Sequence, residues 1–336
     1  MHHSARTVPL AVTAAMLYAR FAAASTCPGL RRLLALTPVL ALLTVLPFFV
    51  PLCSIRGFTA FFLVWLGEFK LLLLAFGAGP LDPGIPPLPF VFTAALPVKL
   101  RQRQMLKAAT VTETVALPLL SSSVKFAVMA AMLGLLHSKK ITHPYAASIL
   151  YCIIIYCALD SVFPCLAAVG RALGMEMEPQ FNKPYLSASL QDFWGRRWNL
   201  MASAVLRPSV YDPVRARLGA AAGVLATFVV SGLMHEVMAY YLTFKAPTGH
   251  VTAFFVLHGA CVCAERWCAR RCGATAKPPR VVATPLVVAF VAGTAFWLFF
   301  PALFGDGMSD LYVAETVALG SSFLDAGRRL LRLGSL

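Results

Sequence analysis

The chain has 336 residues, of which 59% are hydrophobic and 13% are charged, and its mean hydropathy is +0.75. This composition leaves too little polar surface for a soluble domain and predicts that the lipid bilayer is the solvent. The net charge of +15 comes from 29 basic and 14 acidic residues. These charges form short clusters without a continuous basic face, which excludes nucleic acid as a partner and indicates basic cytosolic loops.

Eight apolar runs have lengths near the ~20 residues that cross a bilayer as a helix. The first could pass for a signal peptide, but Arg20 interrupts it, so we interpret it as a span. Residues 88–98 are too short to cross and are a candidate re-entrant segment. No polar stretch is long enough for a separate domain, so we predict one all-α polytopic domain over 1–336. The predicted spans are 8–24, 33–53, 58–76, 111–136, 145–169, 219–243, 250–268 and 282–304.

Prolines occur within or at the ends of several predicted spans, at Pro38, Pro47, Pro118 and Pro164. Membrane helices tolerate such breaks where neighbouring helices or a cavity satisfy the freed backbone groups. The pattern therefore predicts a bundle of bent helices around an internal chamber.

The basic clusters predict an orientation through the excess of Lys and Arg on the cytosolic side. If the cluster from Lys99 to Lys107 is cytosolic, so are the connector 170–217 and the cluster from Arg266 to Arg280. The loops at Lys139 and Lys140, at Lys245, and at Asp306 and Asp310 then lie outside. The N-terminal third stays undecided, because Arg31 and Arg32 precede a span that Arg56 follows.

The nine cysteines mostly lie inside apolar runs, where cysteine behaves as a small hydrophobic residue. The closest group, Cys261, Cys263, Cys268 and Cys272, lacks the paired C-x-x-C spacing of a zinc site. We therefore expect no disulfide framework, no metal and no cofactor.

His235 lies deep in the predicted span 219–243, where an ionisable side chain is costly and is a functional candidate. Burial favours the neutral imidazole, which is the form that a general base needs. Ser231 lies four residues earlier on the same helical face, and Gly232 allows a second helix to approach closely. The alternative is a histidine that only bonds neighbouring helices.

Other ionisable residues in the spans raise a different possibility, because proton-coupled transporters are built from such groups. A transporter would use Asp160, Glu68 and His235 as a relay. Glu236 points about 100° away from His235 on a helix, so we expect a structural contact for it. Lys70, Lys125 and Glu265 are interpreted in the same way.

The segment 187–199 is too polar to span and rich in aromatic residues, which predicts an interfacial amphipathic helix. Ser189 and Asp192 resemble a capping box. On a continuous helix Asp192, Arg196 and Asn199 share one face, while Trp194 and Trp198 share another and anchor the helix at the membrane surface.

These motifs resemble the membrane-bound O-acyltransferase family, specifically its plant-type wax synthase branch of long-chain-alcohol O-fatty-acyltransferases. A tryptophan-rich Asn motif followed some 36 residues later by an intramembrane His is specific to it. The resemblance covers nearly the whole chain and is weakest before residue 30 and after about residue 305. The segments that match are residues 183–187, 189–199, 206–208, 211–213 and 231–236, with 69–72 and 79–81.

The resemblance implies the family fold and places Asn199 and His235 at its two active-site positions. His235 would be the general base that activates an acceptor hydroxyl, and Asn199 would donate to the thioester carbonyl. The resemblance implies an acyl-coenzyme A tunnel from the cytosol and a lateral entrance for the acceptor. Candidate substrate-binding residues are Asp192, Trp194, Arg196, Arg197, Trp198 and Ser231, with the arginines facing coenzyme A phosphates or lipid headgroups.

The expected partners are acyl-coenzyme A, a membrane lipid alcohol and the bilayer itself, and the expected location is the endoplasmic reticulum membrane. Long-chain primary alcohols rank first as acceptor by resemblance, with sterol and diacylglycerol as alternatives. A non-catalytic scaffold that binds acyl chains is a further alternative, besides the transporter.

Overall fold

The computed structural model describes residues 2–98, 113–138, 141, 143–172, 175, 177–272 and 278–333, and its regular elements there are all helices. The clusters Lys99 to Lys107 and Lys139/Lys140 lie outside the described residues, as do the first two residues of the predicted span 111–136 and the side chain of Cys272. The helices are α1 (His2–Ser25), α2 (Leu30–Val45), α3 (Cys53–Ala60), α4 (Glu68–Ala75), α5 (Pro87–Ala95), α6 (Glu113–His137), α7 (Pro144–Ala172), α8 (Leu190–Asp192), α9 (Leu200–Leu206), α10 (Asp212–Thr243), α11 (His250–Cys272), α12 (Arg280–Thr294), α13 (Phe300–Phe304) and α14 (Met308–Leu333).

Eight helical stretches of the described chain are long and apolar enough to cross a membrane, and they coincide with the eight predicted spans. The prediction of a polytopic all-α membrane protein is confirmed. The longest stretch, Leu200–Thr243, also takes in α9 and a π-helical turn over Arg207–Tyr211, so it begins well before the predicted 219.

Several spans contain breaks in the regular α-helix, and one of the prolines in the predicted spans, Pro47, lies in a 3₁₀ turn over Leu46–Phe49. Pro38 lies inside α2 and Pro164 inside α7. π-helical turns over Phe61–Gly67 and Ala295–Phe299 join α3 to α4 and α12 to α13, each within one span. The sharpest break is Gly219 in α10, whose φ of 87° is a conformation that residues with a Cβ rarely adopt.

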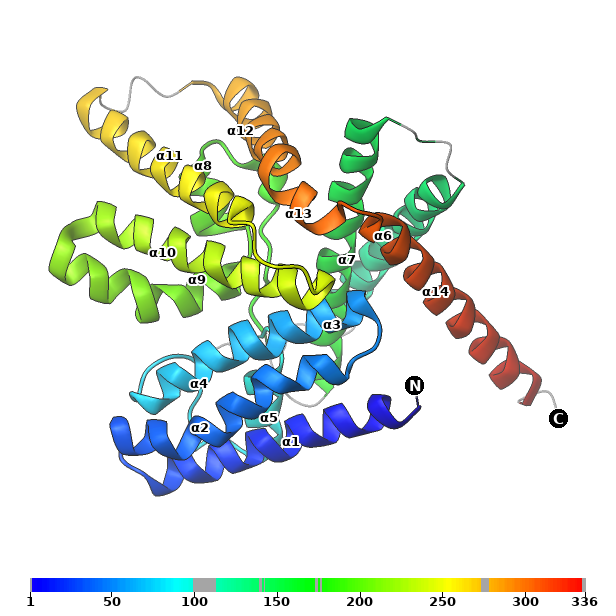
Figure 1. Cartoon of the computed structure of the whole chain (residues 1–336), viewed down its shortest axis with the longest axis horizontal. Coiled ribbons are helices and arrows are strands. Elements are labelled where there is room, and N and C mark those ends of the chain that lie inside the picture. The colour runs from blue at the N-terminus through cyan, green and yellow to red at the C-terminus, as the bar shows by residue number, and fades with distance from the viewer. Residues whose placement is uncertain are drawn as a thin grey trace.

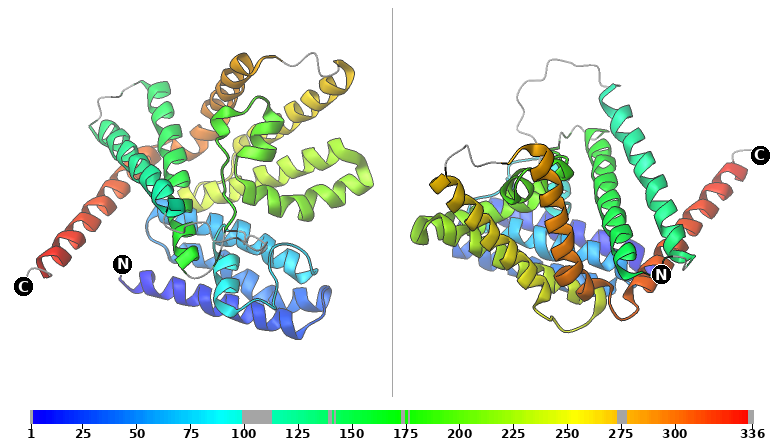
Figure 2. Two further views of the ribbon diagram at one scale, coloured as in Figure 1. Left: turned by 180° about the vertical axis from the view of Figure 1, so that it is seen from behind. Right: turned by 90° about the horizontal axis from the view of Figure 1, so that it is seen from above.

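The N-terminal helices α1, α2, α4 and α5 form one side of the molecule, and α9 to α12 lie beside them (Figure 1). The core that α1, α2, α4 and α5 share includes Met16, Leu36, Leu43, Leu71 and Phe90, all fully buried. The segment 88–98 contains α5, which packs in this core. Helices α6 and α7 form a hairpin, one end of which stands clear of the other helices in the right view of Figure 2, while Tyr151 of α7 stacks on Phe304 of α13.

Three cations are buried among the described residues of the N-terminal half, and each donates hydrogen bonds to backbone carbonyl groups near helix ends. Arg32 donates to carbonyls of Thr26 and Leu74, Arg56 to those of Tyr241 and Leu242, and Lys70 to those of Thr93 and Leu96. The C-terminal end of a helix carries partial negative charge and unpaired carbonyl groups, so it stabilises a cation there. Arg32 and Arg56 are therefore packing residues, which explains why charge alone left the N-terminal third undecided.

Helix α14 is an element that the sequence analysis does not predict. It projects away from the bundle (Figures 1 and 2). Its Glu315 accepts hydrogen bonds from the backbone N–H groups of Cys53 and Ser54, at 2.9 and 3.1 Å. These are unpaired donors at the start of α3, so Glu315 caps that helix from a distant part of the chain.

Candidate active site

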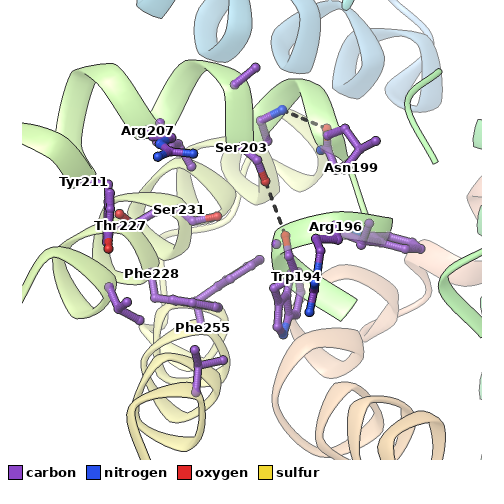
Figure 3. Close-up of a pocket in the computed structure, with 18 of the residues that line it drawn as sticks. Trp194, Arg196, Asn199, Ser203, Arg207, Tyr211, Thr227, Phe228, Ser231 and Phe255 are labelled. Carbon is purple, nitrogen blue, oxygen red and sulfur yellow. Dashed lines mark hydrogen bonds between the residues drawn. The ribbon is translucent and has the colours of Figure 1, made fainter. Parts of the chain in front are cut away.

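A cavity of about 620 Å³ lies between the connector 177–199 and helices α9, α10 and α11. Both residues predicted to be catalytic, Asn199 and His235, line it. Four of the six predicted substrate-binding residues line it as well: Trp194, Arg196, Trp198 and Ser231. Figure 3 shows how the connector and α9 face α10 and α11 across this space.

One face of α10 forms a wall of the cavity. Val224, Phe228, Ser231 and His235 line it at spacings of three or four residues, which is the repeat of one helical face. At a rise of 1.5 Å per residue, Val224 and His235 are separated by roughly 16 Å along the helix axis. The cavity is therefore long, and His235 lies far along it from Val224.

The hydrogen bond of His235 determines which ring nitrogen carries the proton. Nδ1 lies 2.7 Å from the backbone carbonyl oxygen of Ser231, one turn earlier in α10. A carbonyl oxygen can only accept, so Nδ1 is the donor and, in the neutral ring, Nε2 has the free lone pair. The site thus holds a histidine whose second nitrogen is able to accept a proton.

Aromatic rings surround the imidazole of His235. Phe255 of α11 stacks on it with ring centroids 4.3 Å apart, and Trp65 meets it edge-on at 4.6 Å. Phe299 makes a third, edge-on contact at 5.8 Å. These rings fix the orientation of the imidazole and exclude water from its faces.

Glu236, next to His235, has the structural role that was expected. Its carboxylate is buried and accepts a hydrogen bond from the backbone N–H of Thr252 at 3.1 Å, in the first turn of α11. The backbones are close here because position 232 is glycine: a Cβ on Gly232 would lie 2.8 Å from the Cα of Thr252. Gly232 and Glu236 together hold α11 against α10 and so bring Phe255 onto His235.

Asn199 occupies a turn that suits asparagine in two ways. Its φ of 43° is left-handed, a conformation that Asn tolerates better than most residues with a Cβ. Its side-chain oxygen caps α9 by accepting from the backbone N–H of Ala202 at 3.1 Å (Figure 3). Because the oxygen is used in this cap, the NH₂ group is the part of the amide that remains to donate to a substrate.

The prediction of one continuous helix over 187–199 is wrong. The helix ends in a π-helical turn over Phe193–Arg197, Trp198 is extended, and Asn199 begins the next helix. Distant backbone groups hold the break: Leu200 N–H donates to Gln180 O at 2.9 Å, and Asn182 N–H donates to Arg197 O at 2.9 Å. The predicted Ser189 cap is present, with Asp192 N–H donating to its hydroxyl.

The two tryptophans, which are predicted to anchor this segment at the membrane surface, are half-buried and pack against protein aromatic rings. Trp194 packs against Phe228 and Phe255, and Trp198 stacks on Phe193 with centroids 5.5 Å apart.

Asp192 and Arg197 are not among the residues that line this cavity, and their substrate-binding role stays a prediction. Arg197 Nε donates to Asp192 Oδ2 at 2.7 Å, and its guanidinium also bonds the carbonyls of Asn182 and Lys183. Partial burial raises the pKa of the Asp192 carboxyl, but the hydrogen bonds from Arg197 and the Ala188 N–H, together with the charges of Arg197 and Arg196, outweigh this and hold the pKa below its usual value. This pair therefore shapes the connector.

Arg196 also forms an ion pair with Asp192, at 3.3 Å, and is one of four arginines that line the cavity. The side chains of Arg196 and Arg207 are about 70% exposed, at 71% and 70%. Arg215 is also exposed, and Arg266 is half-buried. With Glu178 as the one acidic residue of the lining, this part of the cavity is strongly cationic and open to water, whereas the part around His235 is aromatic.

The ionisable residues proposed for a transporter relay are not brought together. Asp160 forms an ion pair with Lys125 at 2.8 Å between α7 and α6, and Glu68 accepts from the Thr44 hydroxyl. Neither lines the cavity that contains His235. Glu265 accepts from the backbone N–H groups of Leu190 and Gln191 and so caps α8.

The sequence analysis missed His258, a fully buried histidine in the α11 span. Its Nδ1 lies 3.0 Å from the indole nitrogen of Trp194. The rule that singled out His235, an ionisable side chain inside a span, applies equally to His258.

Comparison with known proteins agrees with this geometry. The sequence profile of the membrane bound O-acyl transferase family matches residues 177–257, which contain both Asn199 and His235. The chain is 39% identical over 315 residues to the long-chain-alcohol O-fatty-acyltransferase of Simmondsia chinensis, covering 89% of each protein. The chain belongs to the membrane-bound O-acyltransferase family.

Two Arabidopsis thaliana proteins extend this result. The acyltransferase family member named probable long-chain-alcohol O-fatty-acyltransferase 1 is 39% identical over 308 residues, covering 89% of this chain and 90% of the relative. Acyl-CoA–sterol O-acyltransferase 1 is 34% identical over 331 residues, covering 95% and 96%. As a membrane-bound O-acyltransferase, this chain is thus similar along most of its length to proteins named for two different alcohol acceptors.

Proposed function

We propose that this acyltransferase transfers a fatty acyl group from acyl-coenzyme A to the hydroxyl of a long-chain fatty alcohol, forming a wax ester in the endoplasmic reticulum membrane. The observation that carries the proposal is the single cavity that joins an exposed cationic end to Asn199 and His235. Such a shape suits a substrate with a charged head and an apolar reactive end.

The cationic end would bind coenzyme A. Arg196, Arg207 and Arg215 are exposed and line one cavity, and guanidinium groups bind phosphate oxygens through paired hydrogen bonds. The thioester would then lie deeper along α10, where the lining becomes aromatic.

Acyl transfer needs one proton acceptor and one group that stabilises negative charge. Nε2 of His235 takes the proton of the alcohol as the hydroxyl oxygen attacks the thioester carbonyl. The Asn199 NH₂ group donates to the carbonyl oxygen, on which negative charge develops. Collapse of the tetrahedral intermediate forms the ester and breaks the carbon–sulfur bond, and the thiolate of coenzyme A takes the proton from His235.

The acceptor is a neutral lipid in this proposal, because an ion without a dedicated partner is costly to desolvate beside the aromatic rings around His235. Long-chain alcohols rank first because two relatives named for them are 39% identical, whereas the relative named for sterol is 34% identical. A sterol is the second candidate.

A competition assay tests the proposal. Purified protein in detergent receives labelled palmitoyl-coenzyme A with equal amounts of a long-chain alcohol, a sterol and diacylglycerol, and the products are separated. Wax ester should dominate. Dominant sterol ester or triacylglycerol would leave acyl transfer intact and overturn the acceptor, and no ester from any of the three would overturn the enzymatic function.

A further inference from the structure

His258 does not line the cavity, so any effect on the reaction must pass through its partners. Both ring nitrogens have one: Trp194 Nε1 lies 3.0 Å from Nδ1, and Thr294 Oγ1 lies 2.9 Å from Nε2. The ring is fully buried inside a span, where an ionisable side chain is rare and usually functional.

These hydrogen bonds run in one direction. An indole nitrogen can only donate, so Nδ1 of His258 is the acceptor and Nε2 carries the proton. Nε2 therefore donates to the Thr294 hydroxyl, which donates in turn to the backbone carbonyl of Phe290 at 2.7 Å. This series of hydrogen bonds leads from Trp194 to the backbone of α12 and keeps the imidazole of His258 neutral.

Trp194, the first donor in this series of hydrogen bonds, contacts α9, which Asn199 caps, and Phe228 of α10, the helix that carries His235. Its carbonyl oxygen accepts from the Ser203 hydroxyl of α9 at 3.3 Å, and α9 is the helix that Asn199 caps (Figure 3). Its indole packs against Phe255 with centroids 5.6 Å apart, and Phe255 stacks on His235.

Packing alone leaves the rotation of an aromatic ring weakly defined, because the torsion that turns the ring has broad minima. A hydrogen bond from the indole N–H selects one rotation. We propose that His258 is a positioning residue for acyl transfer: by accepting the Trp194 N–H, it fixes the indole and with it the placement of Asn199 relative to the Phe255–His235 stack. This inference rests on the function proposed above.

Variants can separate positioning from packing. His258→Phe fills the space without an acceptor, whereas His258→Asn retains an oxygen close to the place of Nδ1. We expect His258→Phe to lower kcat by roughly 10- to 100-fold, the scale of a misplaced reacting group, with the KM for acyl-coenzyme A within about twofold of wild type. His258→Asn should recover most of the lost rate.

The double variant Trp194→Phe with His258→Phe tests whether the two residues act together. It should be no slower than the slower single variant, because both substitutions remove the same hydrogen bond. Phe304→Leu is the control, since it loosens the same aromatic cluster away from Trp194 and should leave kcat unchanged. Wild-type kcat in His258→Phe, or equal losses in the Phe and Asn variants, would overturn the inference.

A measurement without substrate separates this inference from the proposed function. In protein labelled with ¹⁵N at the indoles, the Trp194 resonance is assigned by its loss in Trp194→Phe. It should shift in His258→Phe and stay near its wild-type position in His258→Asn. An unchanged resonance in His258→Phe contradicts the hydrogen bond, whereas absence of ester formation by a wild-type protein with the expected resonance contradicts only the function.

Discussion

At the scale of single residues, the proton of the neutral His235 ring is fixed on Nδ1 and aromatic rings surround the imidazole, and both features follow from its place in α10. We predict that His235→Ala lowers ester formation by ~10²- to 10⁴-fold, the usual contribution of a general base, while the protein remains folded in detergent. His250→Ala, at the exposed start of α11, is the matched control and should keep wild-type turnover. Turnover of His235→Ala within a few-fold of wild type would contradict the role of base.

Asn199 has two separable functions, one for each end of its amide. Asn199→Asp keeps an oxygen that caps α9, and a carboxylate is favourable at a helix N-terminus, so thermal stability should stay near wild type. Turnover should fall by ~10²- to 10³-fold because the NH₂ donor is lost. An Asp variant as active as wild type would exclude a donor role.

Asn199→Ala completes this comparison. It removes the donor and the cap together, so it should lose turnover to a similar extent and also about 1 kcal/mol of stability. Thermal unfolding measured beside turnover distinguishes the two variants. Equal stability of the Ala and Asp variants would mean that the cap contributes nothing measurable.

Asp192 gives a prediction for pH, because its carboxyl pKa is held below the usual value. A lowered pKa in the folded state stabilises the fold above the unfolded pKa of about 3.9, and this stabilisation disappears as pH falls through the folded value. Asp192→Asn should therefore be less stable than wild type at pH 7, and the difference should close as pH falls below about 4. Unfolding midpoints in detergent across this range test it, and a difference that persists at low pH would contradict the account.

At the scale of elements, the approach of α10 to α11 positions the aromatic surround of His235. Gly232→Ala places a methyl group 2.8 Å from the backbone of Thr252, so the helices must separate. We expect loss of thermal stability and of turnover together. Gly134→Ala in α6 is the matched control: its Cβ meets nothing within 4 Å, and alanine is the better helix former, so stability should be unchanged or rise by up to about 1 kcal/mol. A stable, active Gly232→Ala variant would show that this contact is looser than described.

At the scale of the whole molecule, contacts between loops bring together ends of spans that are far apart in the sequence. Lys245 Nζ lies 2.7 Å from Asp306 Oδ2. Glu315 caps the start of α3, and Arg56 of α3 donates to the Leu242 carbonyl at the end of α10. Arg197 of the connector and Arg280 at the start of α12 line a common hollow. This grouping matches the alternation predicted from charge, which places the loops at Lys245 and Asp306 together outside and the connector inside.

Single-cysteine labelling of sealed microsomes with an impermeant reagent tests the orientation. In a background without native cysteines, Cys at positions 245 and 306 should react only from the lumen, and Cys at positions 183 and 280 only from the cytosol. The reason is the excess of Lys and Arg in the connector and after α11. Labelling of position 245 from the cytosol alone, or on the opposite side from 306, would refute the assignment.

The sequence by itself determined the eight spans and singled out Asn199 and His235, both of which line one cavity. Hydrophobic runs of membrane length depend only on composition along the chain, and a histidine inside such a run is recognisable without any contact. The tertiary structure decided the rest. The break at Asn199 depends on Gln180 and Asn182, the burial of Arg56 depends on carbonyls from α10, and the tautomer of His258 depends on Trp194. These hydrogen bonds join residues far apart in the chain, so local periodicity gave a continuous helix at 187–199. The basic clusters in the sequence likewise did not show that Arg207, Arg215 and Arg266 line one cavity.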